Sequence, residues 1–414
     1  MTAVAAERPP VSIITGYLGS GKTTLLNRLL RDPGMARAAV IINEFGEVAL
    51  DHLFIATPGD NTVLLANGCL CCTIRGDLVG TLADLLARRG AGGIPAFDRV
   101  LVETTGLADP VPVLRTLASD ETIAPRLRPG AVITLVDGVN GERQLDDCPE
   151  SVKQAAVADC LLISKTDLAE PAALGRLRER LARINPAAQV LESERGSATP
   201  GLLFSAALLD PAAERSAVER WLNEDAYAKQ PRSTAARHVD GIRAFAIRHE
   251  EPVTGAGLTA WLNLMAALKG ARLLRVKGIV NVAGSPVAVH IVQSVIHEPL
   301  ALESWPSADR GTRIVFITRG MERSEIEATL PALGLDASRR TAGAAIDPAA
   351  YARFVAAAAG FRAARDDTPL PIRGARRGFE EHVSEPSSAQ PDAAGWDGRD
   401  RVGVVHQVKG AGKT

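Results

Sequence analysis

The residues best suited to chemistry in this 414-residue chain form a glycine-rich segment near the N-terminus. Residues 16–23 read GYLGSGKT and match the pattern G-x-x-x-x-G-K-[ST], between an apolar run at 11–15 and a helix-forming run at 24–30. In this pattern backbone N–H groups surround phosphate oxygens, the lysine reaches the β- and γ-phosphates, and the last hydroxyl completes the coordination of Mg²⁺. The sequence therefore predicts a nucleotide site made of Gly16, Gly19, Ser20, Gly21, Lys22, Thr23 and Thr24, with Thr23 on the magnesium ion.

A second magnesium candidate ends another apolar run. Glu103 follows the run at 100–102, and Gly106 comes three positions later. We expect Glu103 to join the Mg²⁺ shell, directly or through water, and the N–H of Gly106 to approach the γ-phosphate. The alternative is a strand that simply stops at a solvated glutamate.

The segment Ser164-Lys165-Thr166-Asp167 predicts which base the site prefers. The carboxylate of Asp167 can accept two hydrogen bonds that guanine offers and adenine does not, and Lys165 can lie along the base plane. We therefore expect GTP in preference to ATP, although Ser164 stands where such motifs usually carry asparagine. The alternative is a loop in which Asp167 caps a helix.

Three of the five cysteines crowd together at Cys69, Cys71 and Cys72. Thiolates prefer soft or borderline ions such as Zn²⁺ or Cu⁺, and three of them leave one tetrahedral position open, which suits an ion that is passed on. Three alternatives stay open: buried cysteines that act as small apolar side chains, a redox switch built from Cys71 and Cys72, and a static metal site completed from elsewhere in the fold.

Continuous apolar runs separated by segments of helical period indicate how these motifs are positioned. The runs lie at 11–15, 39–42, 62–65, 100–102, 131–136, 160–163 and 189–191. Strands that are apolar throughout have both faces covered, so the pattern predicts an α/β domain with a mostly parallel sheet. The carboxyl ends of parallel strands are where such sheets bind ligands, and both the glycine-rich loop and the cysteines follow strand ends.

The pattern changes after residue 210, and this change predicts the domain organisation. We expect an N-terminal extension over 1–10, the nucleotide-binding domain over 11–230, a smaller α+β domain over 238–335, a helical extension over 336–365 and a mostly disordered tail over 366–414. In the second domain we expect strands at 241–248, 273–282, 287–296 and 313–318, a helix around 258–265 and another over 324–333.

Composition excludes several classes of protein. Lys and Arg number 47 against 48 Asp and Glu, which gives a net charge of -1 and no general attraction to nucleic acid or anionic lipid. A hydrophobic content of 46% excludes a disordered chain. The sequence shows neither a secretory leader nor an apolar run of membrane-spanning length, so we expect a cytoplasmic protein without a membrane partner.

Together the motifs resemble the CobW-like GTPases, which are related to the nickel-insertion GTPases of hydrogenase and urease among the P-loop metallochaperones. The resemblance rests on the glycine-rich loop and on residues 42–47 (INEFGE), 68–72 (GCLCC), 103–110 (ETTGLADP), 165–168 (KTDL) and 274–278 (LRVKG). It implies a P-loop NTPase fold, hydrolysis of GTP, and a zinc ion that is held at the C-x-C-C site and passed to a client metalloenzyme. It also implies that Glu44 is a fourth metal ligand and that residues 43–46 belong to a switch region.

We expect the γ-phosphate and Mg²⁺ to order segments 43–51 and 103–109 and thereby to change the affinity for the metal. The predicted switch residues are Asn43, Gly46, Asp51, Thr104, Thr105 and Asp109. No glutamine or arginine identifies itself as the residue that positions the attacking water, so intrinsic turnover should be slow.

Other functions compete with zinc delivery. Related proteins suggest Co²⁺ for cobalamin synthesis or the activation of nitrile hydratase, and other classes are a small-molecule P-loop kinase and a redox-responsive regulatory GTPase. The seven histidines are scattered and form no metal-storing stretch, and we expect His290 and His297 to be packing or surface residues.

Overall fold

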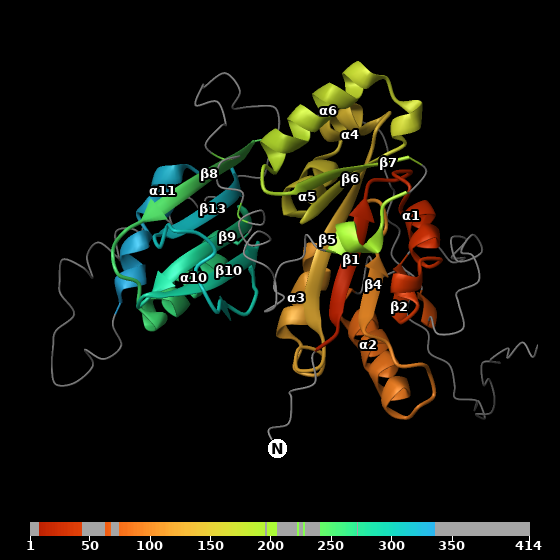
Figure 1. Cartoon of the computed structure of the whole chain (residues 1–414), viewed down its shortest axis with the longest axis horizontal. Helices are drawn as coiled ribbons and strands as arrows, with labels where there is room; N and C mark the ends of the chain where they lie inside the picture. The colour runs from red at the N-terminus through yellow and green to blue at the C-terminus, as the bar shows by residue number, and fades with distance from the viewer. Residues whose placement is uncertain are drawn as a thin grey trace, which may run out of the picture. The chain divides into compact units, whose positions relative to one another are not determined.

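The computed structural model describes residues 8–43, 63–67, 74–194, 197–204, 222, 227, 241–270 and 272–335 (Figure 1). The expected end of the first domain, the expected helical extension and the expected tail lie outside these residues. Within the described part of the chain, no helix is both long enough and apolar enough to cross a bilayer.

The N-terminal domain is built on a seven-stranded sheet with the strand order β3-β2-β4-β1-β5-β6-β7. Its strands are β1 (Pro10–Gly16), β2 (Ala38–Asn43), β3 (Val63–Asn67), β4 (Arg99–Glu103), β5 (Arg128–Asp137), β6 (Cys160–Ser164) and β7 (Gln189–Ser193). Every neighbouring pair is parallel. The parallel α/β sheet predicted from the continuous apolar runs is therefore confirmed.

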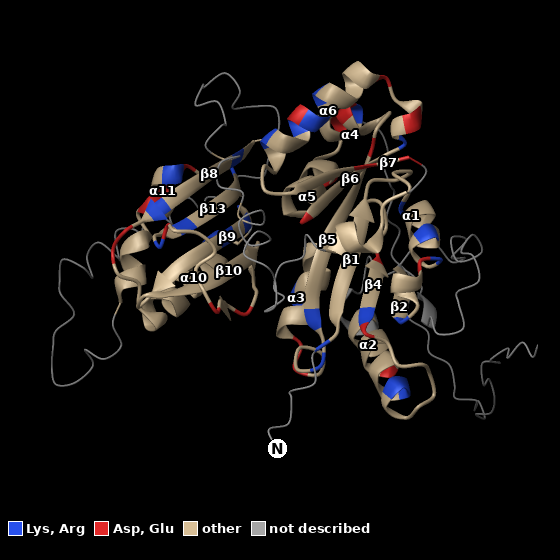
Figure 2. Ribbon diagram, in the orientation of Figure 1, with Lys and Arg blue, Asp and Glu red and all other residues tan. Residues whose placement is uncertain are grey.

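Helices cover both faces of this sheet, as the apolar strands require. They are α1 (Lys22–Leu29), α2 (Ile74–Gly90), α3 (Val111–Ser119), α4 (Gly141–Asp147), α5 (Pro149–Val157), α6 (Pro171–Ile184) and α7 (Pro200–Phe204). Alternate residues of β1 enter different cores: Ile13 packs in the cluster that contains α2 to α6, and Ile14 packs in the one that contains α1. Helix α6 carries charged residues of both signs, most of them arginines (Figure 2).

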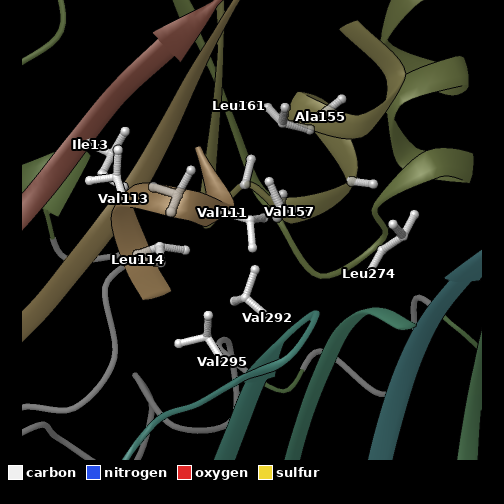
Figure 3. Close-up of a cluster of buried hydrophobic side chains, with 14 of the residues drawn as sticks. Ile13, Val111, Val113, Leu114, Ala155, Val157, Leu161, Leu274, Val292 and Val295 are labelled. Carbon is white, nitrogen blue, oxygen red and sulfur yellow. The ribbon is translucent and has the colours of Figure 1, made fainter. Parts of the chain in front are cut away.

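The C-terminal domain contains a separate antiparallel sheet with the order β11-β10-β9-β13-β8, and β12 pairs with β10. Its strands are β8 (Ile242–His249), β9 (Leu273–Val282), β10 (Ser285–Val292), β11 (Val295–Ile296), β12 (Leu300–Ala301) and β13 (Thr312–Arg319). One face packs on α10 (Gly255–Lys269) in a core that contains Trp261 and Val276. The other face belongs to the core cluster of α3 and α5, as Leu274, Val292 and Val295 show (Figure 3).

Two expected elements of this domain are wrong in detail. The strand expected at 287–296 is a hairpin of β10 and β11, because the chain reverses at Gln293, which has a positive φ of 53°. The helix expected over 324–333 is α11 (Arg323–Glu327) followed by a 3-10 helix over Leu330–Gly334. Pro331 lacks the N–H that a continuous helix needs and disfavours helical geometry at the residue before it.

Candidate functional site

The glycine-rich loop lies between β1 and α1, and its backbone geometry explains its glycines. Gly16, Gly19 and Gly21 have φ values of 140°, 73° and 94°, a region that other residues rarely adopt. A Cβ atom on Gly16 would lie 2.3 Å from the carbonyl oxygen of Leu135 on β5. The loop can therefore keep this shape only with glycine at its first position.

Polar side chains lie along this loop and in the first turn of α1. The Nζ atom of Lys22 donates hydrogen bonds to the carbonyl oxygens of Gly16 (3.0 Å) and Tyr17 (3.2 Å), so the ammonium group spans the loop. Ser20 is fully buried, and its hydroxyl has no hydrogen-bond partner among the described residues. Thr24 is exposed in the first turn of α1, whose N-terminus carries the positive end of the helix dipole. This arrangement fits a bound phosphate chain.

The structure brings the two predicted magnesium ligands together. Glu103 ends β4 beside Ile14 of β1, and its Oε1 atom accepts a hydrogen bond of 3.2 Å from the hydroxyl of Thr23. The carboxylate is only 3% exposed, so Glu103 is not the solvated strand end of the alternative interpretation. One hydroxyl and one carboxylate at the end of a phosphate loop are oxygen ligands of the kind that Mg²⁺ prefers.

The loop after β4 lies against the phosphate loop. The hydroxyl of Thr104 donates a 2.8 Å hydrogen bond to that of Thr15, and both Thr104 and Thr105 are buried. A Cβ atom on Gly106 would lie 2.5 Å from the backbone nitrogen of Leu18. Glycine at this position is therefore what permits the two loops to approach each other.

The predicted base-recognition segment, residues 164–167, is tied to the glycine-rich loop and to a residue that the sequence did not single out. The Ser164 hydroxyl donates to the carbonyl oxygen of Ser20 at 2.6 Å, a link between loops 144 residues apart. Lys165 has a φ of 57°, and its Nζ atom donates a 2.7 Å hydrogen bond to Asp137. Asp137 ends β5 and is 2% exposed, so it fixes the lysine from below the surface.

The pKa of Asp137 reflects these contacts. Burial alone raises the pKa of this carboxyl group, but the hydrogen bond from Lys165 and two backbone N–H groups outweigh burial and hold the pKa below its usual value. The carboxylate is therefore charged at neutral pH. A polar residue directly after the apolar run at 131–136 was the only sequence signal for it.

Asp167 is exposed in the 3-10 helix Thr166–Leu168. It does not cap the following helix, because α6 begins at Pro171 with Glu170 at its N-cap position. The exposed carboxylate is accessible to a ligand at the carboxyl end of β6.

The remaining predicted site residues divide into two groups. Asn43 is the last residue of β2, and Asp109 accepts a 3.0 Å hydrogen bond from the backbone N–H of Val111 at the start of α3. Those outside the described residues are Glu44, Gly46, Asp51, Cys69, Cys71 and Cys72. Within the described ranges there is no group of three or more His, Cys, Asp or Glu side chains that could hold a metal ion.

A strand, a glycine loop and a helix with a lysine and a threonine at its start define a P-loop nucleotide-binding protein. The chain belongs to the CobW/HypB/UreG family. The family model described as "CobW/HypB/UreG, nucleotide-binding domain" matches residues 10–192, and the "Cobalamin synthesis protein cobW C-terminal domain" matches residues 242–333. The resemblance inferred from the motifs is thereby confirmed.

Curated relatives and a solved structure agree with this placement. The chain is 35% identical over 277 residues to "Zinc chaperone YjiA" of Escherichia coli, which covers 67% of this chain and 83% of the relative. It is 33% identical over 194 residues to "Zinc-regulated GTPase metalloprotein activator 1" of Schizosaccharomyces pombe, with 45% of this chain and 46% of the relative covered. The crystal structure of Zn(II)-bound YjiA GTPase matches with a TM-score of 0.61 and 28% identity, over 80% of this chain and all of that one.

Proposed function

We propose that this protein is a GTP-hydrolysing zinc chaperone that binds zinc at Cys69, Cys71 and Cys72 and passes it to a client metalloenzyme. The observation that carries the proposal is the contact between Thr23 and Glu103, which brings the two predicted magnesium ligands together at the end of β4, in the same sheet as β3, the strand that precedes the cysteines. Family membership and the similarity to a zinc chaperone and to a zinc-regulated metalloprotein activator support the same function.

The residues present fit Mg²⁺ and GTP. Lys22 would neutralise charge on the β- and γ-phosphates, Thr23 and Glu103 would hold the metal ion, and the N–H of Gly106 would sense the γ-phosphate. Bound Mg²⁺ would neutralise the charge that develops on the phosphate oxygens. Asp167 would accept hydrogen bonds from guanine, with Lys165 held along the base by Asp137.

Strand order supports a metal site next to the nucleotide. The segment with the cysteines follows β3, and the segment with Glu44 follows β2. These strands are parallel neighbours, with Asn43 in register with Asn67, and Ile42 of β2 is in register with Glu103. Both segments therefore start at the edge of the sheet that carries the predicted magnesium ligand.

The other two cysteines lie apart from the cluster in the sequence, and one of them is a poor competitor for the metal. Cys160 lies inside β6, where burial raises the pKa of its thiol to about 12 and keeps it protonated. Cys148 is half-buried between α4 and α5. Cys148→Ala serves as a control for Cys71→Ala, since both remove one thiol from the same chain; because Cys148 is hydrogen-bonded to Tyr17 of the glycine-rich loop, GTP binding by this variant is measured as well.

The decisive experiment is metal transfer by the reduced, full-length protein. Zn²⁺-loaded protein is mixed with candidate apo-metalloenzymes in the presence of Mg²⁺ and either GTP or a non-hydrolysable analogue, and recovered client activity is measured. We expect transfer with GTP by the wild type and by Cys148→Ala, and none by Cys71→Ala. Zinc uptake that is equal in all three proteins would refute the thiolate site, and preferential loading with Co²⁺ in competition would replace zinc as the cargo.

A further inference from the structure

The loop 104–110, next to the phosphate loop, is held by one helix. On α5, the Lys153 ammonium donates a 2.5 Å hydrogen bond to Asp109, and both side chains are partly buried. The adjacent Gln154 is 1% exposed, and its Nε2 atom donates to the carbonyl oxygens of Gly106 (3.2 Å) and Ala108 (3.0 Å). Two consecutive residues of α5 thus fix the segment in which Gly106 would approach the γ-phosphate.

The same helix ends on the C-terminal sheet. The carbonyl oxygen of Val157, the last residue of α5, accepts a hydrogen bond from the guanidinium group of Arg275 on β9. Asp159, two residues further on, accepts another hydrogen bond from Arg275 and lies 3.5 Å from the Nζ atom of Lys277. All three charged side chains are less than 5% exposed, so this joint is enclosed by protein.

A second helix makes a parallel connection. Asp109 accepts the first N–H of α3, which starts directly after the loop. Val111 and Leu114 of α3 lie in the same buried cluster as Val292 and Val295 of the β10–β11 hairpin (Figure 3). Loop 104–110 is therefore connected to the C-terminal sheet through two helices, α5 and α3.

We propose that α5 transmits the nucleotide state from loop 104–110 to the C-terminal sheet, with Lys153 and Gln154 as positioning residues for the loop and the Arg275–Asp159 pair as the joint between the domains. The inference rests on the proposed GTPase activity and is independent of the cysteine site. Gln154 binds two carbonyl oxygens of one short loop, so a shift of that loop either moves α5 or leaves buried polar groups without partners. Interior packing is close, and a small displacement at one end of a helix is passed on to its contacts.

The role of the C-terminal domain follows from this connection. Its sheet would take up two positions relative to the nucleotide-binding domain, one for GDP and one for GTP. Linkage then requires that changes at the joint alter the relative affinities for the two nucleotides, although Arg275 belongs to a different domain from the phosphate loop.

The test compares hydrogen–deuterium exchange of residues 272–297 in the full-length protein bound to GDP and to a non-hydrolysable GTP analogue. For the wild type we expect exchange rates in this segment to differ at least about fivefold between the two states, the lower end of typical allosteric coupling. The difference should fall below about twofold in Gln154→Leu and in the double variant Asp159→Asn/Arg275→Met. The double variant removes both charges of the pair and so leaves no uncompensated buried carboxylate.

Two further measurements keep the outcome decisive. Lys153→Met changes only a partly buried side chain, so it replaces the double variant if that variant does not fold. The difference in exchange between the two nucleotide states should also fall in Lys153→Met. Arg176→Met removes a surface ion pair with Glu142 on α6 and α4 and should keep the wild-type difference. Equal exchange in the two nucleotide states of the wild type, or an unchanged difference in Gln154→Leu, would overturn the inference alone. Failure of the wild type to bind GTP would overturn the proposed function as well.

Discussion

Lys277 allows the energetics of the domain joint to be tested by titration. Its side chain is 2% exposed, and burial, reinforced by the charge of Arg275 and opposed by Asp159, lowers the pKa of its ammonium group from the ordinary 10.5 to about 7. Two histidines, His290 and His297, stack with their ring centroids 4.2 Å apart, and both interact electrostatically with Arg275. Both are more than nine-tenths buried, so they are packing residues and not surface residues.

The sign of the effect follows from proton binding. Between its folded and unfolded pKa values Lys277 carries a proton only in the unfolded chain, so the free energy of unfolding rises with pH by about 1.4 kcal/mol per pH unit. From about pH 7.5 to about pH 9 this amounts to about 2 kcal/mol. Burial lowers the pKa of His297 to about 4 and that of His290 well below its usual value, so neither histidine titrates in this interval in either state.

The perturbation is Lys277→Met, which keeps the apolar stem and removes the titrating group. Urea unfolding is followed by tryptophan fluorescence at both pH values, because Trp261 is fully buried in the same domain. The raised pKa of Cys160 gives an opposite pH dependence, but it is common to both proteins and cancels in their difference. The wild type should gain about 2 kcal/mol relative to the variant on going to the higher pH. Parallel pH profiles would show that Lys277 is not buried in its neutral form and would refute this account.

Two further changes test the nucleotide site. Asp137→Asn removes the charged acceptor of the Lys165 hydrogen bond. The ratio of GTP affinity to ATP affinity, measured by competition binding, should therefore fall about tenfold, which corresponds to about 1.4 kcal/mol. An unchanged ratio would show that Asp137 has no part in base recognition. Gly106→Ala places a Cβ atom 2.5 Å from the backbone nitrogen of Leu18. Overpacking of this kind typically costs about 1–3 kcal/mol, so the affinity for GTP should drop more than about tenfold. Gly80→Ala on α2, where a Cβ atom meets nothing within 4 Å, is the control and should raise stability by about 0.5–1 kcal/mol without changing GTP binding.

The local features of this chain were readable from its sequence. The phosphate loop occupies eight consecutive residues between a strand and a helix, and its geometry is set by glycines and by the start of α1. Strand β9 lies at the predicted residues, 273–282, because every second position from Leu274 to Val282 carries an apolar residue or glycine and several of these residues are β-branched. The β10–β11 hairpin was missed because the turn at Gln293 carries no glycine or proline to mark it.

The sequence by itself determined the nucleotide chemistry, the sheet and the two-part organisation, because these depend on residue type and on short-range period. Only the tertiary structure decided which residues distant in the sequence meet around the predicted site and at the C-terminal sheet. Asp137 meets Lys165 across 28 residues, Gln154 meets Gly106 across 48, and Arg275 meets Val157 across 118. Such contacts follow from the order of strands in the sheet and from the docking of a second domain, and neither is encoded in the spacing of residues along the chain.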